Sequence, residues 1–181
     1  MLTEFVRDHA FAIAWFGLMT LVWCGWGQEA PTKQWSIRLG IASGLGLVLT
    51  GLFGYGVFRR WRTASALEGQ HHWFGVLVAA EVILAGVGCV YLWRNGRTRW
   101  MAWWVAIVVA AHFIPLALLL RDWSMAVLGL VQLAALIVLL PRFRADDGPT
   151  SRLAGPVMGL SLLAFSVISA VVFVIRWGAP W

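Results

Sequence analysis

Charged residues are scarce in this chain. Asp, Glu, Lys and Arg together make up 12% of its 181 residues, whereas an average soluble domain contains about 25%. Apolar residues make up 61%, and the mean hydropathy is +0.79. This composition excludes an intrinsically disordered chain and argues against a soluble globular domain. It is typical of an integral membrane protein.

Cysteines and acidic residues are also few. The two cysteines, Cys24 and Cys89, lie in apolar stretches and form no Cys-x-x-Cys motif, so the sequence predicts neither a disulfide framework nor a zinc site. Eight acidic residues against fourteen Lys and Arg give a formal net charge of +6. The basic residues fall between apolar segments, where membrane proteins place them, and we therefore expect no nucleic-acid partner.

Long apolar runs are abundant. Six segments can be read, at about 9–26, 37–58, 71–93, 100–120, 123–140 and 153–175. Each has roughly 18–23 residues, enough to cross about 30 Å of hydrocarbon as an α-helix. The connecting loops are short. We therefore predict an all-α integral membrane protein, with residues 1–181 forming one compact bundle of six transmembrane helices, no soluble domain, and both termini on the same side.

The orientation in the membrane follows from the basic residues. We name the side that holds both termini side A and the opposite side side B. Side A carries six basic residues (Arg7, Arg59, Arg60, Arg62, Arg121 and Arg176), and side B carries eight (Lys33, Arg38, Arg94, Arg97, Arg99, Arg142, Arg144 and Arg152). We expect the protein to lie in the cell (inner) membrane. Because cytoplasmic loops carry the excess of Lys and Arg, the small excess on side B favours termini on the non-cytoplasmic side. Glu4 and Asp8 argue against a cleaved signal peptide at the start of the chain.

Small and aromatic residues are placed as in membrane bundles. Most of the 13 tryptophans lie near segment ends, where indoles form an aromatic belt. Two sets of glycines each share one helix face: Gly40, Gly44, Gly51 and Gly54 in the second segment, and Gly75 and Gly86 in the third. Such spacings let helices approach closely in lipid. They fit packing within one chain and packing in a homodimer equally well.

The apolar segments contain one carboxylate, Glu81, and one clearly intramembrane histidine, His112. An ionisable side chain at mid-membrane costs about 2.5–3.5 kcal/mol or more, and so it marks a functional site by default. Glu81 lies 15 residues before Gly96 in the third turn, and His112 lies 16 residues after it. In an antiparallel hairpin both lie roughly 23 Å from that turn, near the bilayer centre. The two side chains can therefore pair if they face each other.

The other four predicted helices each carry a polar side chain at about the same depth: Thr20, Thr50, Gln132 and Ser166. Thr and Ser can bond their own helix carbonyls, so Gln132 carries more weight. The aromatic residues Trp15, Phe74 and Tyr55 are candidate walls of a pocket that holds a cation. Two interpretations remain open. The layer is either a substrate or proton site at the midplane or a buried hydrogen-bonded network that fixes helix register.

Histidines near side A raise the question of a cofactor. The first predicted helix begins at His9 and the third begins at His71 and His72, at similar depth. Paired histidines on facing helices can ligate a haem. However, no second histidine pair lies inside the spans, and no carboxylate has the spacing of a metal site. We therefore predict no cofactor and no metal.

From these residues we expect a transporter of a small cationic or amphipathic solute. Glu81 and His112 would form a proton-coupled site, and Gln132, Thr50 and Ser166 would orient the ligand. One alternative is a non-catalytic membrane subunit or scaffold that binds lipid or a partner protein. The third is an intramembrane enzyme that uses Glu81 and His112 as acid and base. No nucleophile lies at a defined spacing, so a non-enzyme is favoured. Expected partners are membrane lipids, the solute and a second copy of the chain.

Overall fold

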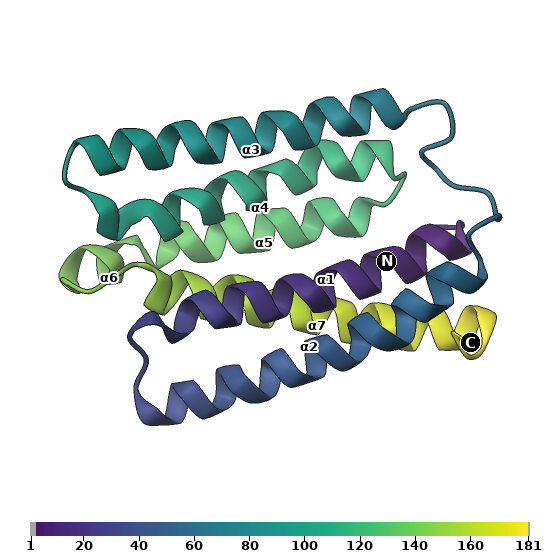
Figure 1. Ribbon diagram of the computed structural model, residues 1–181, viewed down its shortest axis with the longest axis horizontal. Coiled ribbons are helices and arrows are strands. Elements are labelled where there is room, and N and C mark those ends of the chain that lie inside the picture. The colour runs from purple at the N-terminus through teal and green to yellow at the C-terminus, as the bar shows by residue number, and fades with distance from the viewer. Residues whose placement is uncertain (1–2, 181) are drawn as a thin grey trace.

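The computed structural model describes residues 3–180 and shows a bundle of helices (Figure 1). Its long helices are α1 (Val6–Trp26), α2 (Lys33–Arg59), α3 (His71–Arg94), α4 (Met101–Leu119), α5 (Trp123–Val138) and α7 (Ser151–Trp177). The short elements between them are η1 (Gly27–Glu29), η2 (Thr98–Trp100) and α6 (Leu140–Ala145). Residues 3–180 contain no β-strand, which confirms the predicted all-α class.

The apolar segments correspond closely to the long helices. Five of these helices, α1, α2, α3, α4 and α7, are long and apolar enough to cross a membrane by length and composition. α2 and α7 extend beyond the apolar segments at both ends, because a helix continues through polar residues while its backbone groups stay hydrogen-bonded. α5 has only 16 residues and ends at Val138. Pro141 lies at the start of α6, where its ring removes a backbone donor and disfavours a continuous helix.

The long helices form two groups of three (Figure 1). In the first group α1 packs along α2 and α7, and in the second α4 packs along α5 and α3. α7 also contacts α4 and α5 and so joins the two groups. α3 lies at the edge of the bundle, and none of its residues is buried. One long face of α3 is therefore left uncovered by residues 3–180.

Both ends of the described chain lie at one end of the bundle (Figure 1). The His9 ring packs against that of Trp177, with centroids 5.0 Å apart. The Arg60 guanidinium, just after α2, donates to the backbone carbonyls of Ala179, at 3.1 Å, and Pro180. This end of the bundle corresponds to side A. The end that carries η1, η2 and α6 corresponds to side B.

Close packing between helices uses glycines other than the six expected. α1 and α2 cross at Gly17 and Gly46, where a Cβ added to Gly17 would lie 2.5 Å from the Gly46 carbonyl oxygen. α7 approaches α1 in the same way at Gly159, where an added Cβ would lie 2.5 Å from Cys24 Sγ. By contrast, a Cβ would meet nothing within 4 Å at Gly40, Gly44, Gly51, Gly54, Gly75 or Gly86. These six glycines do not pack helices within the described chain. In helices that are apolar all round, periodicity identifies the glycine face but not the direction in which it points.

Candidate functional site

Glu81 on α3 and His112 on α4 face each other where these two helices pack. His112 Nε2 lies 3.6 Å from Glu81 Oε2, which is ion-pair distance when the imidazole is protonated. Both side chains are largely withdrawn from solvent, with exposed fractions of 12% for His112 and 19% for Glu81. A single charge placed here would be costly. A carboxylate beside an imidazolium compensates that charge, and the pair can hold one proton between two groups.

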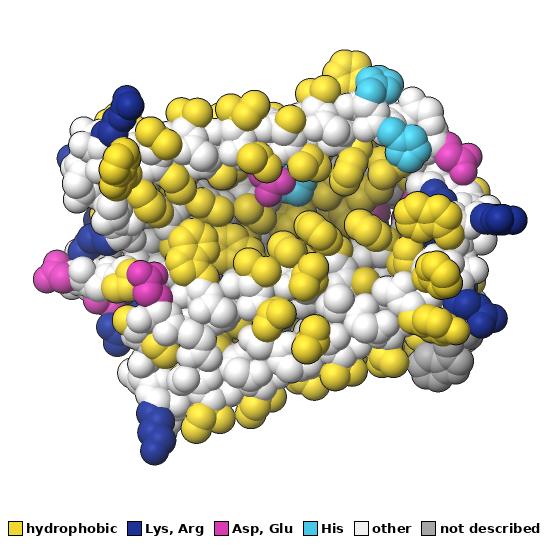
Figure 2. Space-filling view, in the orientation of Figure 1, with side chains coloured by type: hydrophobic (Ala, Val, Ile, Leu, Met, Phe, Trp, Pro, Cys, Tyr) yellow, Lys and Arg dark blue, Asp and Glu magenta, His cyan; other side chains and the backbone are white. Residues whose placement is uncertain are grey.

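The pair opens into a cavity of about 300 Å³ between α1, α3, α4 and α5. Its walls are mostly aromatic and aliphatic, and they include Trp15, Phe16, Phe74, Phe113, Leu116 and Met125. Figure 2 shows this face of the molecule hollowed between α3 and α1, with an acidic and a histidine side chain inside the hollow and apolar side chains around it. The lining residues of α1, α3 and α4 come from the side A half of each helix. The cavity therefore extends from the Glu81–His112 pair toward side A.

A second carboxylate, Asp8, lies at the side A end of the same cavity. Asp8 is buried, and its carboxylate accepts a hydrogen bond of 2.7 Å from the backbone N–H of Ala66. Leu67, the next residue, also lines the cavity. The hydrogen bond from Ala66 to Asp8 thus fixes the connection between α2 and α3 at the side A end of the cavity. Sequence reasoning treated Asp8 only as a flanking residue, because nothing in the local pattern shows that residues 60–70 fold back over it.

Thr20, Thr50 and Ser166 do not line this cavity. The Thr50 and Ser166 hydroxyls donate to two successive carbonyls of α1, those of Ala14 at 3.1 Å and Ile13 at 2.9 Å. Thr20 donates to Phe16 of its own helix at 2.8 Å. Thr50 and Ser166 therefore tie α2 and α7 to α1, which is the structural use of such hydroxyls. The structure separates these three residues from Glu81 and His112.

Gln132 is also apart from the pair. It is fully buried on α5, and its Nε2 donates to Ser161 Oγ on α7 at 2.8 Å. Its Oε1 has no hydrogen-bond partner within residues 3–180. The polar residues expected at one level therefore form separate groups, of which only Glu81 and His112 share a cavity. Depth along a helix can be read from the sequence, but the rotation of each helix is set by packing.

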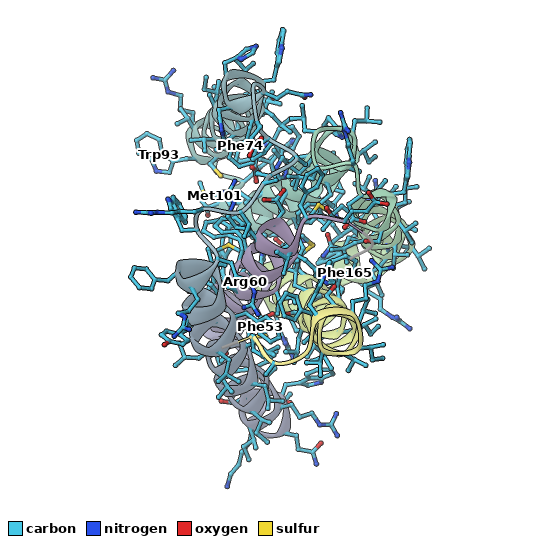
Figure 3. All side chains as sticks on the ribbon, turned by 90° about the vertical axis from the view of Figure 1, so that its right-hand side faces the viewer. Phe53, Arg60, Phe74, Trp93, Met101 and Phe165 are labelled. Atoms are coloured by element: carbon cyan, nitrogen blue, oxygen red, sulfur yellow. The ribbon has the colours of Figure 1, made fainter. Side chains whose placement is uncertain are left out.

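Two of the three expected aromatic walls line the cavity, and one does not. Trp15 on α1 and Phe74 on α3 lie on opposite walls. Figure 3, viewed along the bundle, shows Phe74 on the inner side of α3 and Trp93 pointing away from the bundle. Tyr55 is half exposed on α2, where its hydroxyl accepts a hydrogen bond from Arg59 at 3.3 Å.

Further aromatic side chains complete the wall. The Phe16 and Phe113 rings meet edge to face with centroids 5.5 Å apart, and Phe11 stacks on Trp15 with centroids 6.1 Å apart. All of them line the cavity. Sequence reasoning missed Phe11, Phe16 and Phe113, since no local signal distinguishes them from the many other apolar residues of these helices.

The three histidines considered for haem do not form a ligand set. His9 is fully buried, with Nε2 3.1 Å from the Ser169 carbonyl oxygen, and its ring packs against Phe173 and Trp177. His71 and His72 are exposed at the start of α3. Within the part of the chain that the structure describes, no group of three or more His, Cys, Asp or Glu side chains is placed to hold a metal ion.

No family model, curated protein or solved structure matches this chain.

Proposed function

We propose that this chain spans a cell (inner) membrane six times and transports a small cationic or amphipathic solute through the Glu81–His112 site. The length and composition of five helices support this topology. α5 is the sixth span, and a span shorter than the hydrocarbon layer is accommodated by local thinning of the bilayer. Six spans place both termini on side A. The excess of basic residues on side B then orients the termini away from the cytoplasm.

The observation that carries the transport proposal is the Glu81–His112 pair inside an aromatic-walled cavity. Apart from Glu81, His112 and Asp8, the lining is apolar, and a carboxylate in such surroundings attracts a positively charged group. The Trp15 ring face adds a cation–π attraction, and the apolar walls favour a solute with hydrophobic substituents. The cavity extends from Glu81 toward side A as far as Asp8, where the segment with Ala66 and Leu67 covers it.

Coupling to protons follows from charge balance. With His112 protonated and Glu81 ionised, the pair is neutral. When a monovalent cation binds beside Glu81 and the His112 proton leaves, the net charge of the site is again zero. An unbalanced charge in a weakly polar site is costly, so this one-for-one exchange has a smaller barrier than the binding of a cation alone. The chemistry supports exchange of a proton for a cation.

The test is a thermal-shift titration of the purified protein with tetraphenylphosphonium as the probe cation. We expect the probe to stabilise wild type by RT ln(1 + [L]/Kd) and to leave Glu81→Gln unshifted. Glu4→Gln is the matched control, because Glu4 is an exposed carboxylate that does not line the cavity. An equal response of wild type and Glu81→Gln would contradict a cation site at Glu81.

One observation favours a second candidate function, that of a membrane subunit that assembles through its glycine faces. The α2 glycines Gly44 and Gly51 point into open space within this chain, and glycine faces of this kind pack against other helices in lipid. A homodimer or a partner protein would use this face. Gly51→Leu would then abolish assembly measured by cross-linking in membranes, while Glu81→Gln would leave it intact.

A further inference from the structure

A second, larger cavity lies between α3 and the start of α4, toward side B. Its volume is about 970 Å³, and it shares no lining residue with the Glu81 cavity. α3 contributes Leu84, Val87, Gly88, Tyr91 and Leu92, which recur at helical spacing on one face. Trp100, Trp103 and Trp104 form the opposite wall, and Arg97 and Arg99 lie at the side B end. The cavity thus has an apolar length and a cationic end.

Trp104 contacts the α3 backbone at the wall of this cavity. Its indole Nε1 donates to the Leu84 carbonyl of α3 at 3.0 Å. The ring lies against the α3 backbone at Gly88, where any Cβ would overlap it. A large aromatic ring therefore stands between two helix backbones at this point. Between this contact and the turn at Gly96, α3 and α4 leave the space that forms the cavity.

A space of this size does not stay empty in a membrane. Protein interiors are packed as densely as organic crystals, and apolar cavities do not hold water well, because water needs polar partners. α3 lies at the edge of the bundle with no buried residue, so the lipid phase has access to its face. In a bilayer, lipid acyl chains are the apolar groups that surround α3 and could fill this space.

The cationic end of the cavity selects the headgroup. The Arg99 guanidinium already binds two acceptors of the protein. It lies 3.4 Å from an Asp147 carboxylate oxygen and 3.0 Å from the Phe143 carbonyl oxygen. Arg97 is exposed, and within residues 3–180 its guanidinium makes no hydrogen bond or ion pair. An uncompensated arginine at the mouth of an apolar cavity, in a Trp-rich layer at headgroup level, fits a phosphate.

We propose that this cavity binds one anionic phospholipid, with an acyl chain along Leu84, Val87 and Tyr91 and the phosphate at Arg97. The site is separate from the transport site, and it rests only on the membrane-spanning topology proposed above. Arg97 supplies the preference for a net negative headgroup. The α3–α4 cavity supplies the requirement for an acyl chain.

The test compares dioleoyl phosphatidylglycerol, dioleoyl phosphatidylcholine and glycerol 3-phosphate in thermal-shift titrations of the detergent-solubilised full chain. Wild type should bind phosphatidylglycerol more tightly than phosphatidylcholine and should not respond to glycerol 3-phosphate. Arg97→Gln should raise the Kd for phosphatidylglycerol about fivefold, from the attraction of about 1 kcal/mol per basic residue near an anionic lipid. Arg94→Gln is its control, an exposed arginine of the same turn outside the cavity.

A second variant tests the cavity itself. Val87→Phe should fill it and weaken the binding of both phospholipids without disturbing the core, because Val87 is 64% exposed. Val82→Phe, equally exposed on α3 but outside the cavity, should change nothing. The proposal is overturned by any one of three results: equal binding of the two phospholipids to wild type, equal effects of either variant and its control, or a response to glycerol 3-phosphate as strong as that to phosphatidylglycerol.

Discussion

At the scale of single residues, the central feature is an acidic and a basic side chain that face each other in apolar surroundings. The 3.6 Å separation between His112 Nε2 and Glu81 Oε2 allows charge compensation without a fixed hydrogen bond. Removing one partner leaves the other as an isolated polar group in a weakly polar site, which is more costly than removing both. Replacement of either residue alone by Leu should therefore lower the free energy of unfolding, measured by unfolding in SDS, more than the paired change Glu81→Leu with His112→Leu.

Trp15 provides a residue-scale prediction. Its ring lines the Glu81 cavity and is 46% exposed, so it can face a bound cation without a change in packing. Trp15→Leu should raise the Kd for tetraphenylphosphonium about 2- to 30-fold, the range that corresponds to a cation–π attraction of about 0.5–2 kcal/mol. Trp123→Leu, an exposed tryptophan outside the cavity, is the control. Equal Kd values for the two variants in the thermal-shift titration would remove Trp15 from the site.

At the scale of helices, two kinds of glycine differ in what they do. Gly46 lies where α2 crosses α1, and a Cβ there would lie 2.5 Å from the Gly17 carbonyl oxygen. Gly44, half a turn away, faces open space. Gly46 is required for the two backbones to approach. Gly44 costs the helix conformational entropy and packs against nothing within residues 3–180.

The same substitution at these two positions should have opposite effects on stability. Gly46→Ala should lower the free energy of unfolding by about 1–3 kcal/mol through overpacking. Gly44→Ala should leave it unchanged or raise it by up to about 1 kcal/mol through helix propensity. Unfolding by SDS in mixed micelles, followed by circular dichroism, measures both. Destabilisation by Gly44→Ala that grows with protein concentration would show instead that this face packs against a second copy.

The elements differ in how far the sequence determines them. The long helices follow from apolar runs, and the shared depth of Glu81 and His112 follows from counting residues from Gly96. That they face each other depends on the rotation of α3 and α4. The packing of Thr50 and Ser166 on α1, and the fold of Ala66 over Asp8, depend on contacts between distant segments. Nearly uniform apolar helices carry no polar face from which such rotations could be read.

At the scale of the whole molecule, the bundle is asymmetric along its length. The Glu81 cavity extends toward side A, while the larger α3–α4 cavity lies toward side B. Trp104 and Leu84 line the α3–α4 cavity, and the Trp104 indole donates to the Leu84 carbonyl of α3. In the proposed transport cycle, the solute site is therefore nearer to side A than to side B. Both ends of the described chain, residues 3–180, lie on that same side of the bundle (Figure 1).

The six-span topology makes a prediction about the termini. Epitope tags at the N-terminus and the C-terminus should be equally accessible to protease from the same side of sealed vesicles. The physical reason is that α5, although short, must return the chain to side B before α7 crosses to side A. If α5 lay in the membrane without crossing it, five spans would remain and the two tags would be digested from opposite sides.

The most direct test of the central claim is the number of protons released when a cation binds at Glu81. Tetraphenylphosphonium added to weakly buffered, detergent-solubilised wild type should release about one proton per bound cation while His112 is protonated. Over the same pH range its Kd should fall about tenfold for each unit that the pH rises, because protons compete with the cation. Binding without proton release, or a Kd that does not change with pH, would contradict proton–cation exchange at this site.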